Sequence, residues 1–199
     1  MRFWRVLNWN PAANTAEDNG HPLYVWPRQG AGRVDDSQRE YLVLYVGDSP
    51  MGAVAEAFGR FIRWTPAILE APKVAPSGTI KALVAYDGEP DVLDLDDPYT
   101  LVDWGLRPSQ VVARDRPSTQ RWARAIYDAG GTAGVSWWSY YEPRWASIGL
   151  WDISGLTPVG DPEPLTLDHP VIHGAAEAIR RIVEVPSARR SRGTGAGPW

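Results

Sequence analysis

Residues 42–58 read LVLYVGDSPMGAVAEAF and predict a buried strand that leads directly into a helix. The run 42–46 is apolar and rich in β-favouring residues, which is typical of a buried strand. Ser49-Pro50 then joins a favoured helix N-cap to a residue suited to the first helical position, so a helix is predicted over 51–62. Glu56 lies beside the apolar face of this predicted helix.

Shorter elements are predicted on both sides of this segment. Two Gly- and Pro-rich stretches predict a long polar loop over 8–40 and a connection over 154–168. Long loops in compact domains are usually functional, so the first of these is of interest. Short strands interleaved with a few helices predict a compact mixed α+β domain around a strongly bent sheet. The further strands are predicted over 2–7, 80–86, 91–95, 135–138 and 146–153, and the further helices over 98–104, 118–127 and 169–185.

The length of 199 residues favours one domain of ordinary size followed by a tail. The net charge is −4, but Arg189, Arg190 and Arg192 sit together near the end, without acidic neighbours. The rest of the chain therefore carries 17 basic and 24 acidic residues. Such an acidic body argues against a broad nucleic-acid-binding face, which needs clustered Lys and Arg. The basic end is predicted to be a flexible tail.

The composition also restricts the expected cellular location and the types of catalytic or metal site that the chain can form. No apolar run is long enough to predict a membrane span, and the first residues lack the pattern of a secretion signal, so a cytoplasmic protein is expected. The chain contains no cysteine. This excludes disulfides, thiolate-bound zinc, iron–sulfur clusters and thiol catalysis within the chain.

Several familiar catalytic motifs are missing or incomplete. His169 and His173 are four residues apart on a predicted helix, but no Glu lies between them and no acidic third ligand is evident, so no metal site is predicted. The glycine-rich stretch 130–134 lacks the Lys-Ser/Thr of a phosphate-binding P-loop. No Gly-x-Ser-x-Gly nucleophile elbow occurs, so a Ser–His–Asp triad has no support.

Tryptophan is unusually frequent, with 11 Trp against 3 Phe. A Trp-rich core is the favoured interpretation, because the large indole ring suits buried and half-buried positions. The alternative is a non-catalytic binding module in which aromatic rings stack on sugars or bases. The candidate platform for such stacking consists of Trp137, Trp138, Tyr140, Tyr141 and Trp145.

A set of weak motifs in a fixed order carries more information than any of them alone. The motifs are Arg5-Val6, Gly32-Arg33, Leu44-Tyr45, Ala53-Val54-Ala55-Glu56, the run from Gly134 to Ser139, and Ile148-Gly149-Leu150-Trp151. In order and spacing they resemble the RES family, which is named for its Arg, Glu and Ser. The resemblance covers roughly residues 2–152. The positions that match the name are Arg33, Glu56 and Ser139.

The resemblance implies a fold and a division of the chain. RES proteins are similar in fold to ADP-ribosyltransferases, so the expected class is α+β, a compact mixed domain with a bent, mostly antiparallel sheet. The implied catalytic domain spans residues 1–155. Residues 156–185 are then a connection and a C-terminal helix packed on the same domain, and residues 186–199 are the basic flexible tail.

The resemblance also implies an activity, because characterised members are bacterial toxins that consume NAD and are paired with an antitoxin. The implied function is breakdown of NAD at the nicotinamide–ribose bond, by hydrolysis or phosphorolysis. NAD is then a substrate, inorganic phosphate is a candidate co-substrate, and no metal is needed. Arg33 would bind the pyrophosphate, Glu56 would stabilise positive charge on the ribose, Tyr45 would stack on or orient the nicotinamide, and Ser139 would bind the ribose or hold Glu56.

The implied partner is an antitoxin with a helix-turn-helix DNA-binding domain. Direct contact with nucleic acid or a membrane is not expected. A homodimer of the toxin within the toxin–antitoxin complex is a candidate state. Protein mono-ADP-ribosylation at the same site is the alternative activity. The residues leave the acceptor open between water, phosphate and protein.

Each site residue also has a structural interpretation, and the family pattern is not matched everywhere. A lone Arg is often a surface residue, a strand Tyr a core residue, a helical Glu an ion-pair partner and a strand-end Ser a turn cap. Ser136 is a rival to Ser139. Val34 replaces a common aromatic residue, Tyr140-Tyr141 replaces a more usual basic residue, and Asp35-Asp36 would oppose a bound anion if they faced it.

Overall fold

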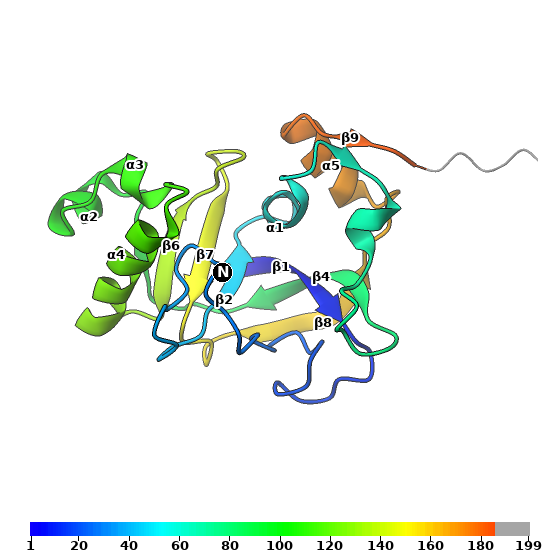
Figure 1. Cartoon of the computed structure of the whole chain (residues 1–199), viewed down its shortest axis with the longest axis horizontal. Helices are drawn as coiled ribbons and strands as arrows, with labels where there is room; N and C mark the ends of the chain where they lie inside the picture. The colour runs from blue at the N-terminus through cyan, green and yellow to red at the C-terminus, as the bar shows by residue number, and fades with distance from the viewer. Residues whose placement is uncertain (186–199) are drawn as a thin grey trace, which may run out of the picture.

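A seven-stranded sheet forms the centre of the protein in a computed structural model, which describes residues 1–185 (Figure 1). The strand order is β5-β6-β7-β2-β1-β4-β8, and only β5 and β6 pair in parallel. The α+β class and the mostly antiparallel sheet are therefore confirmed. The strands are β1 (Arg2–Trp9), β2 (Leu44–Gly47), β4 (Ile80–Asp87), β5 (Val92–Asp94), β6 (Gly134–Trp138), β7 (Ala146–Leu150) and β8 (Thr157–Pro164).

The sheet is bent sharply at its middle. In Figure 1, β6 and β7 run steeply, while β1, β4 and β8 run nearly across the view. The two halves meet between β2 and β1, which share only the single pair Trp4↔Gly47, whereas β1 pairs with β4 over all eight of its residues. Because so few hydrogen bonds join the two halves there, the strands diverge and leave space between them.

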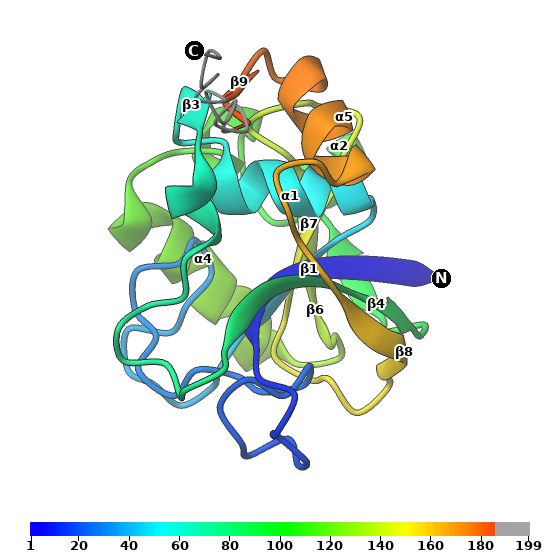
Figure 2. The same cartoon turned by 90° about the vertical axis from the view of Figure 1, so that its right-hand side faces the viewer.

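Two groups of helices cover the two halves of the sheet. Near β1, the helix α1 (Pro50–Phe58) packs against α5 (Pro170–Ala178) around a cluster that includes Val54, Trp64 and Ile172. The other half carries α2 (Pro98–Asp103), α3 (Pro108–Val111) and α4 (Arg116–Ala129), which lie beside β6 (Figure 1). A small parallel pair, β3 (Arg63–Trp64) with β9 (Ile182–Val183), and the 3-10 helix η1 (Pro66–Leu69) complete the elements. Figure 2 shows α1 and α5 stacked above β1 and β4.

The boundary of α1 differs from the predicted one for a physical reason. Ser49 is the N-cap and its hydroxyl accepts a hydrogen bond from the Gly52 N–H, as expected. The helix ends at Phe58 instead of residue 62, however, because the following turn is held by a buried side chain. The indole of Trp64 donates to the carbonyl oxygens of Phe58 (3.2 Å) and Phe61 (3.1 Å).

The segment after residue 154 contains the largest error of the sequence interpretation. The predicted connection over 154–168 contains β8, which pairs with β4. Its three prolines are tolerated because β8 is an edge strand, where missing N–H donors are not needed by a further neighbour. The predicted helix over 169–185 was also too long, since α5 ends at Ala178 and Arg180 takes a positive φ of 56°.

The predicted long loop is present, since no helix or strand lies within residues 10–43. The middle of this loop is held against β1. Arg5 on β1 donates to the carbonyl oxygens of Pro22 and Tyr24. The predicted tail over 186–199 lies outside the described residues. No helix within residues 1–185 is long and apolar enough to cross a membrane.

Candidate active site

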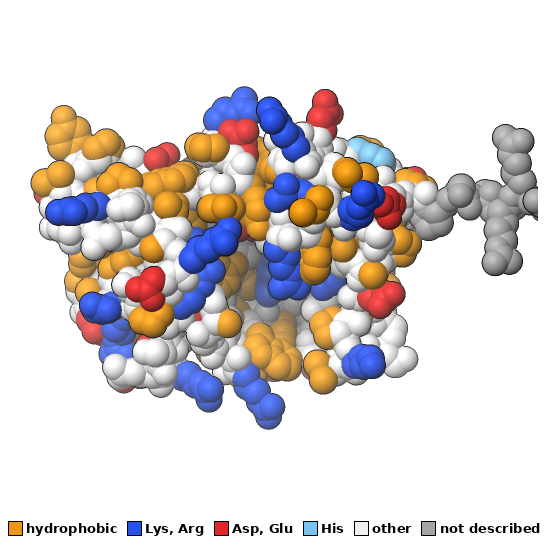
Figure 3. All heavy atoms as spheres, turned by 45° about the horizontal axis from the view of Figure 1, so that its top comes forward, with side chains coloured by type: hydrophobic (Ala, Val, Ile, Leu, Met, Phe, Trp, Pro, Cys, Tyr) orange, Lys and Arg blue, Asp and Glu red, His pale blue; other side chains and the backbone are white. Residues whose placement is uncertain are grey.

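A cleft of about 420 Å³ lies where the sheet diverges between β1 and β2. Figure 3 shows a hollow bordered by Lys and Arg side chains between the two halves of the molecule. The cleft walls come from β1, β2, α1, the long loop, the start of α4 and the β6–β7 hairpin. The lining residues are Trp4, Arg5, Val6, Gly32, Arg33, Tyr45, Val46, Gly47, Ala53, Glu56, Ala57, Arg116, Trp137, Tyr140 and Ser147.

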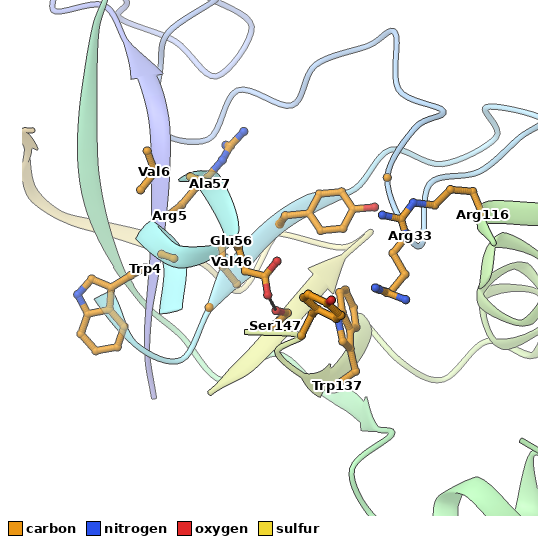
Figure 4. A pocket seen from close by; sticks show the side chains of 15 residues that line it. Trp4, Arg5, Val6, Arg33, Val46, Glu56, Ala57, Arg116, Trp137 and Ser147 are labelled. Atoms are coloured by element: carbon orange, nitrogen blue, oxygen red, sulfur yellow. Dashed lines mark hydrogen bonds between the residues drawn. The ribbon is translucent and has the colours of Figure 1, made fainter. Parts of the chain in front are cut away.

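Glu56 is the acidic residue among these lining residues. It projects from α1 toward β7, as Figure 4 shows, and its Oε1 accepts hydrogen bonds from the hydroxyls of Ser139 (2.6 Å) and Ser147 (3.2 Å). Ser139 is only 1% exposed and its own oxygen accepts the Tyr141 N–H. Two serine donors thus hold one carboxylate oxygen, while the other oxygen, Oε2, has no donor among residues 1–185 and remains open to a ligand.

Arg33 enters the cleft from the long loop and is held by the backbone. Its Nη1 donates to the carbonyl oxygens of Val111 (2.6 Å) and Ala113 (2.8 Å), and its guanidinium carbon lies 5.9 Å from the ring centroid of Trp137. Burial, followed by the nearby positive charge of Arg116, lowers the pKa of Arg33. The other guanidinium nitrogens have no hydrogen-bond partner in the described chain and are free to bind an anion.

Tyr45 connects β2 to the loop that carries Arg33. Its hydroxyl donates to Asp35 Oδ1 (2.6 Å) and accepts the Val34 N–H (3.1 Å), and burial together with the Asp35 charge raises its pKa. Asp35 Oδ2 accepts the N–H groups of Gly30 and Gly32 at 2.7 Å each. A Cβ at Gly32 would collide with both the Tyr45 hydroxyl and the Asp35 carboxylate, so glycine is required beside Arg33.

The helix α4 fixes the same loop from outside. Gln120 donates to the carbonyl oxygens of Gly30 (3.0 Å) and Gly32 (2.9 Å), and Arg124 pairs with Asp36 and Glu40. Asp36, at 2% exposure, also accepts the N–H groups of Gln38 and Glu40. The acidic pair 35–36 is therefore engaged in holding the loop, and neither carboxylate lines the cleft, so the condition under which the pair would oppose a bound anion is not met.

The structure brings the four predicted site residues together. Arg33, Tyr45 and Glu56 line the cleft, and Ser139 lies directly behind Glu56. The rival Ser136 instead donates to Asp94 Oδ1 at 3.0 Å, away from the lining residues. The hydrogen bond between Ser139 and Glu56 joins two residues that are 83 positions apart in the sequence.

The candidate aromatic platform does not form one surface. Trp137 and Trp138 pack into the cluster beside α4, whereas Tyr141 and Trp145 pack against the cluster beside α1. Only Tyr140 among the five is largely exposed, at 58%. The hypothesis that these rings form one platform for stacking on sugars or bases is therefore wrong. Trp137 belongs to the core, and Trp138, Tyr141 and Trp145 are half-buried against the two clusters.

Two polar lining residues were missed by the sequence interpretation. Ser147 on β7 lies opposite Trp137 on β6 and opposite Gly47 on β2, so strand pairing brings it under Glu56. Arg116 is the first residue of α4, and no pattern in the sequence connects it with the other site residues. Within residues 1–185, no three His, Cys, Asp or Glu side chains are grouped as a metal site requires.

Comparisons with known proteins agree with this architecture. A family model described as RES domain matches residues 2–171. No curated protein matches the chain. Among solved structures, the chain is similar to one in the crystal structure of the M. tuberculosis MbcT–MbcA toxin–antitoxin complex, with 17% sequence identity and a TM-score of 0.57. The match covers 83% of this chain and 84% of that chain, so the resemblance in fold extends over most of both.

Proposed function

This chain belongs to the RES domain family, and from this premise we propose that it is a toxin that breaks the nicotinamide–ribose bond of NAD and is neutralised by an antitoxin. The observation that carries the proposal is the Glu56 carboxylate, which is held on one oxygen by two serines and is open on the other. The toxin–antitoxin assembly of the structurally similar protein supports the presence of a partner.

The chemistry of the bond explains the need for such a carboxylate. Departure of nicotinamide leaves positive charge on the ribose, as in the cleavage of a glycosidic bond. A fixed carboxylate stabilises this charge in the transition state, and its free oxygen also accepts a hydrogen bond from a ribose hydroxyl. Because Ser139 and Ser147 orient Glu56 in advance, little reorganisation is required when the charge develops.

Arg33 and Tyr45 supply the complementary contacts. NAD carries a pyrophosphate, and the free nitrogens of an Arg fork bind phosphate oxygens through charge-assisted hydrogen bonds. Tyr45 presents its ring to the cleft while its hydroxyl is occupied by Asp35, so in this proposal the ring contacts the nicotinamide through its face or edge. Trp137, edge-on to Tyr45 at 6.5 Å between ring centroids, supports this wall.

The test is to identify the products when the purified protein is incubated with NAD, with and without inorganic phosphate. Free nicotinamide with ADP-ribose indicates hydrolysis, whereas a phosphorylated ADP-ribose that forms only with phosphate indicates phosphorolysis. NAD that stays intact, with soluble folded protein, would contradict the proposal. NAD labelled in its adenylate part separates the alternative, since label that becomes attached to protein indicates ADP-ribosylation.

Ser139 is proposed to position Glu56 without touching the substrate. Ser139→Ala removes the 2.6 Å hydrogen bond to Glu56 and the acceptor for the Tyr141 N–H. We expect about a tenfold lower kcat for NAD breakdown and about 1–2 kcal/mol lower stability in urea unfolding. Ser147→Ala, which removes the longer 3.2 Å bond, is the matched comparison and has a smaller effect on kcat. An unchanged kcat in Ser139→Ala would contradict the positioning role.

The same proposal implies a partner protein, a stoichiometry and a cellular location. We expect an antitoxin encoded beside the toxin, with a helix-turn-helix domain, and a complex that contains two copies of the toxin. The proposed location is the bacterial cytoplasm, where NAD is available. Co-expression with the neighbouring reading frame, followed by co-purification and mass measurement, tests the partner and its stoichiometry together.

A further inference from the structure

Arg116 is a half-buried cation at the edge of the candidate site, and one of its guanidinium nitrogens is buried without a partner in the described chain. Its side chain lines the cleft, and its Nη1 is fully buried but makes no hydrogen bond within the described chain. A buried donor that lacks a partner costs free energy, and a charged donor costs more than a neutral one. The unpaired nitrogen lowers the stability of the folded protein. Its presence at the cleft therefore indicates a ligand that supplies the missing acceptor.

A second guanidinium lies close to it. Arg33 and Arg116 approach the cleft from the same side, opposite Glu56, as Figure 4 shows. Arg116 is close enough for its charge to lower the pKa of Arg33. No carboxylate forms a hydrogen bond or an ion pair with either side chain within residues 1–185, and Arg33 uses only Nη1 on backbone carbonyls. Two like charges thus face the same space without a bonded carboxylate, and the acid that offsets part of this charge is Glu56 across the cleft.

The charge of the whole cleft favours the same type of ligand. Its lining contains three arginines, Arg5, Arg33 and Arg116, against the single acid Glu56. This local excess of positive charge occurs in a chain whose overall charge is negative. A phosphate group is the anion that matches it best, because its oxygens accept from two forks at once and its charge offsets the repulsion between them.

We propose that Arg33 and Arg116 together form a subsite for one phosphate group. This inference rests on the proposed function only in its choice of ligand, since the phosphate group is either part of the dinucleotide's pyrophosphate or inorganic phosphate bound as acceptor. In both cases Arg116 contacts the anion directly, and Arg33 shares it. The subsite lies across the cleft from Glu56, which keeps the anion apart from the carboxylate.

The binding test uses a Glu56→Gln background, in which the proposed turnover is suppressed, and titrates inorganic phosphate, ADP and adenosine by calorimetry. We expect phosphate and ADP to bind and adenosine to bind much more weakly. Arg116→Met is expected to lower the affinity for phosphate and ADP by about tenfold or more, because charge-assisted hydrogen bonds are lost. Arg116→Lys keeps the charge but loses the two-nitrogen fork, so its affinity for these ligands is expected to lie between those of the parent and of Arg116→Met.

A matched control and a competition experiment complete the design. Arg121→Met removes the same charge from an exposed position of α4 outside the cleft, and binding should be unchanged. Phosphate that is displaced by ADP assigns the subsite to the pyrophosphate, whereas phosphate that binds together with ADP assigns it to the acceptor. Absence of phosphate and ADP binding, or equal binding by Arg116→Met, would overturn the inference.

Stability distinguishes this role from a structural one. Without ligand, Arg116→Met is expected to raise Tm by about 2–4 °C, because a buried guanidinium nitrogen without a partner and the repulsion between Arg116 and Arg33 are removed. The increase in Tm that pyrophosphate causes in the parent protein should be reduced in the variant. A variant that melts earlier or fails to fold would show that Arg116 supports the structure and would refute the subsite. If the parent protein does not break down NAD but binds the anions as expected, that result would count against the proposed function alone.

Discussion

Glu56→Gln is expected to lower the rate of NAD breakdown by about 10²–10³-fold. Glutamine has nearly the same shape and keeps an oxygen that accepts from Ser139 and Ser147, so the hydrogen bonds behind the side chain are retained. What is lost is the negative charge that faces the ribose in the transition state. The loss should therefore appear mainly in kcat, with little change in the binding of NAD.

The measurement compares initial rates of NAD loss and thermal unfolding for the two proteins. Glu56 faces the cleft and contributes no buried apolar surface, so Tm is expected to change little. Glu177→Gln on α5 removes an equivalent charge from an exposed position and serves as the control for both rate and growth. In bacteria, expression of the parent should deplete NAD and arrest growth, and Glu56→Gln should relieve both. Undiminished activity of Glu56→Gln would exclude the carboxylate mechanism.

Arg33→Met is expected to decrease kcat/KM for NAD by about 10²-fold, which corresponds to about 2.7 kcal/mol of transition-state stabilisation. Methionine fills similar space beside Trp137, but it cannot donate to a phosphate or to the carbonyl oxygens of Val111 and Ala113. The charge and the fork that orient the dinucleotide are both lost. Because the loop is independently held by Asp35, Gln120 and Arg124, the fold should persist.

Two variants make this result specific. Arg33→Lys keeps a positive charge and is expected to recover only part of the activity, since one ammonium group cannot replace a two-nitrogen fork. Arg28→Met changes an exposed arginine of the same loop, which does not line the cleft, and should leave kcat/KM unchanged. If Arg28→Met reduced the rate as much as Arg33→Met, the effect would arise from loop charge in general and not from the position of Arg33.

Local signals accounted for the elements that depend on near neighbours. The capping residues Ser49-Pro50 and the apolar strand before them predicted β2 and the start of α1. Boundaries that depend on distant contacts were not predicted. The end of α1 depends on the buried Trp64 indole, and β8 exists because β4 offers a free edge to a proline-containing segment. Neither condition is visible within a window of adjacent residues.

In the candidate site, too, some features were predictable from the sequence and others depend on distant contacts. The order and spacing of motifs singled out Arg33, Tyr45, Glu56 and Ser139, and these four meet in the structure. The sequence left open whether Asp35 and Asp36 would face a bound anion and oppose it, and the tertiary structure turns the Asp35 carboxylate toward Tyr45 and two backbone N–H groups. The direction of a side chain in a loop depends on which donors surround it, and this information is absent from the sequence pattern.

The sequence by itself determined the family motifs, the mixed α+β class and the chemical type of the central residues, because these depend on residue identity and local periodicity. Only the tertiary structure decided where the chemistry is concentrated. The divergence of β1 from β2 opens the cleft, strand pairing carries Ser147 beneath Glu56, and the start of α4 places Arg116 beside Arg33. The strand and helix predicted from residues 42–58 form a scaffold, and long-range packing makes that scaffold one wall of a charged cleft.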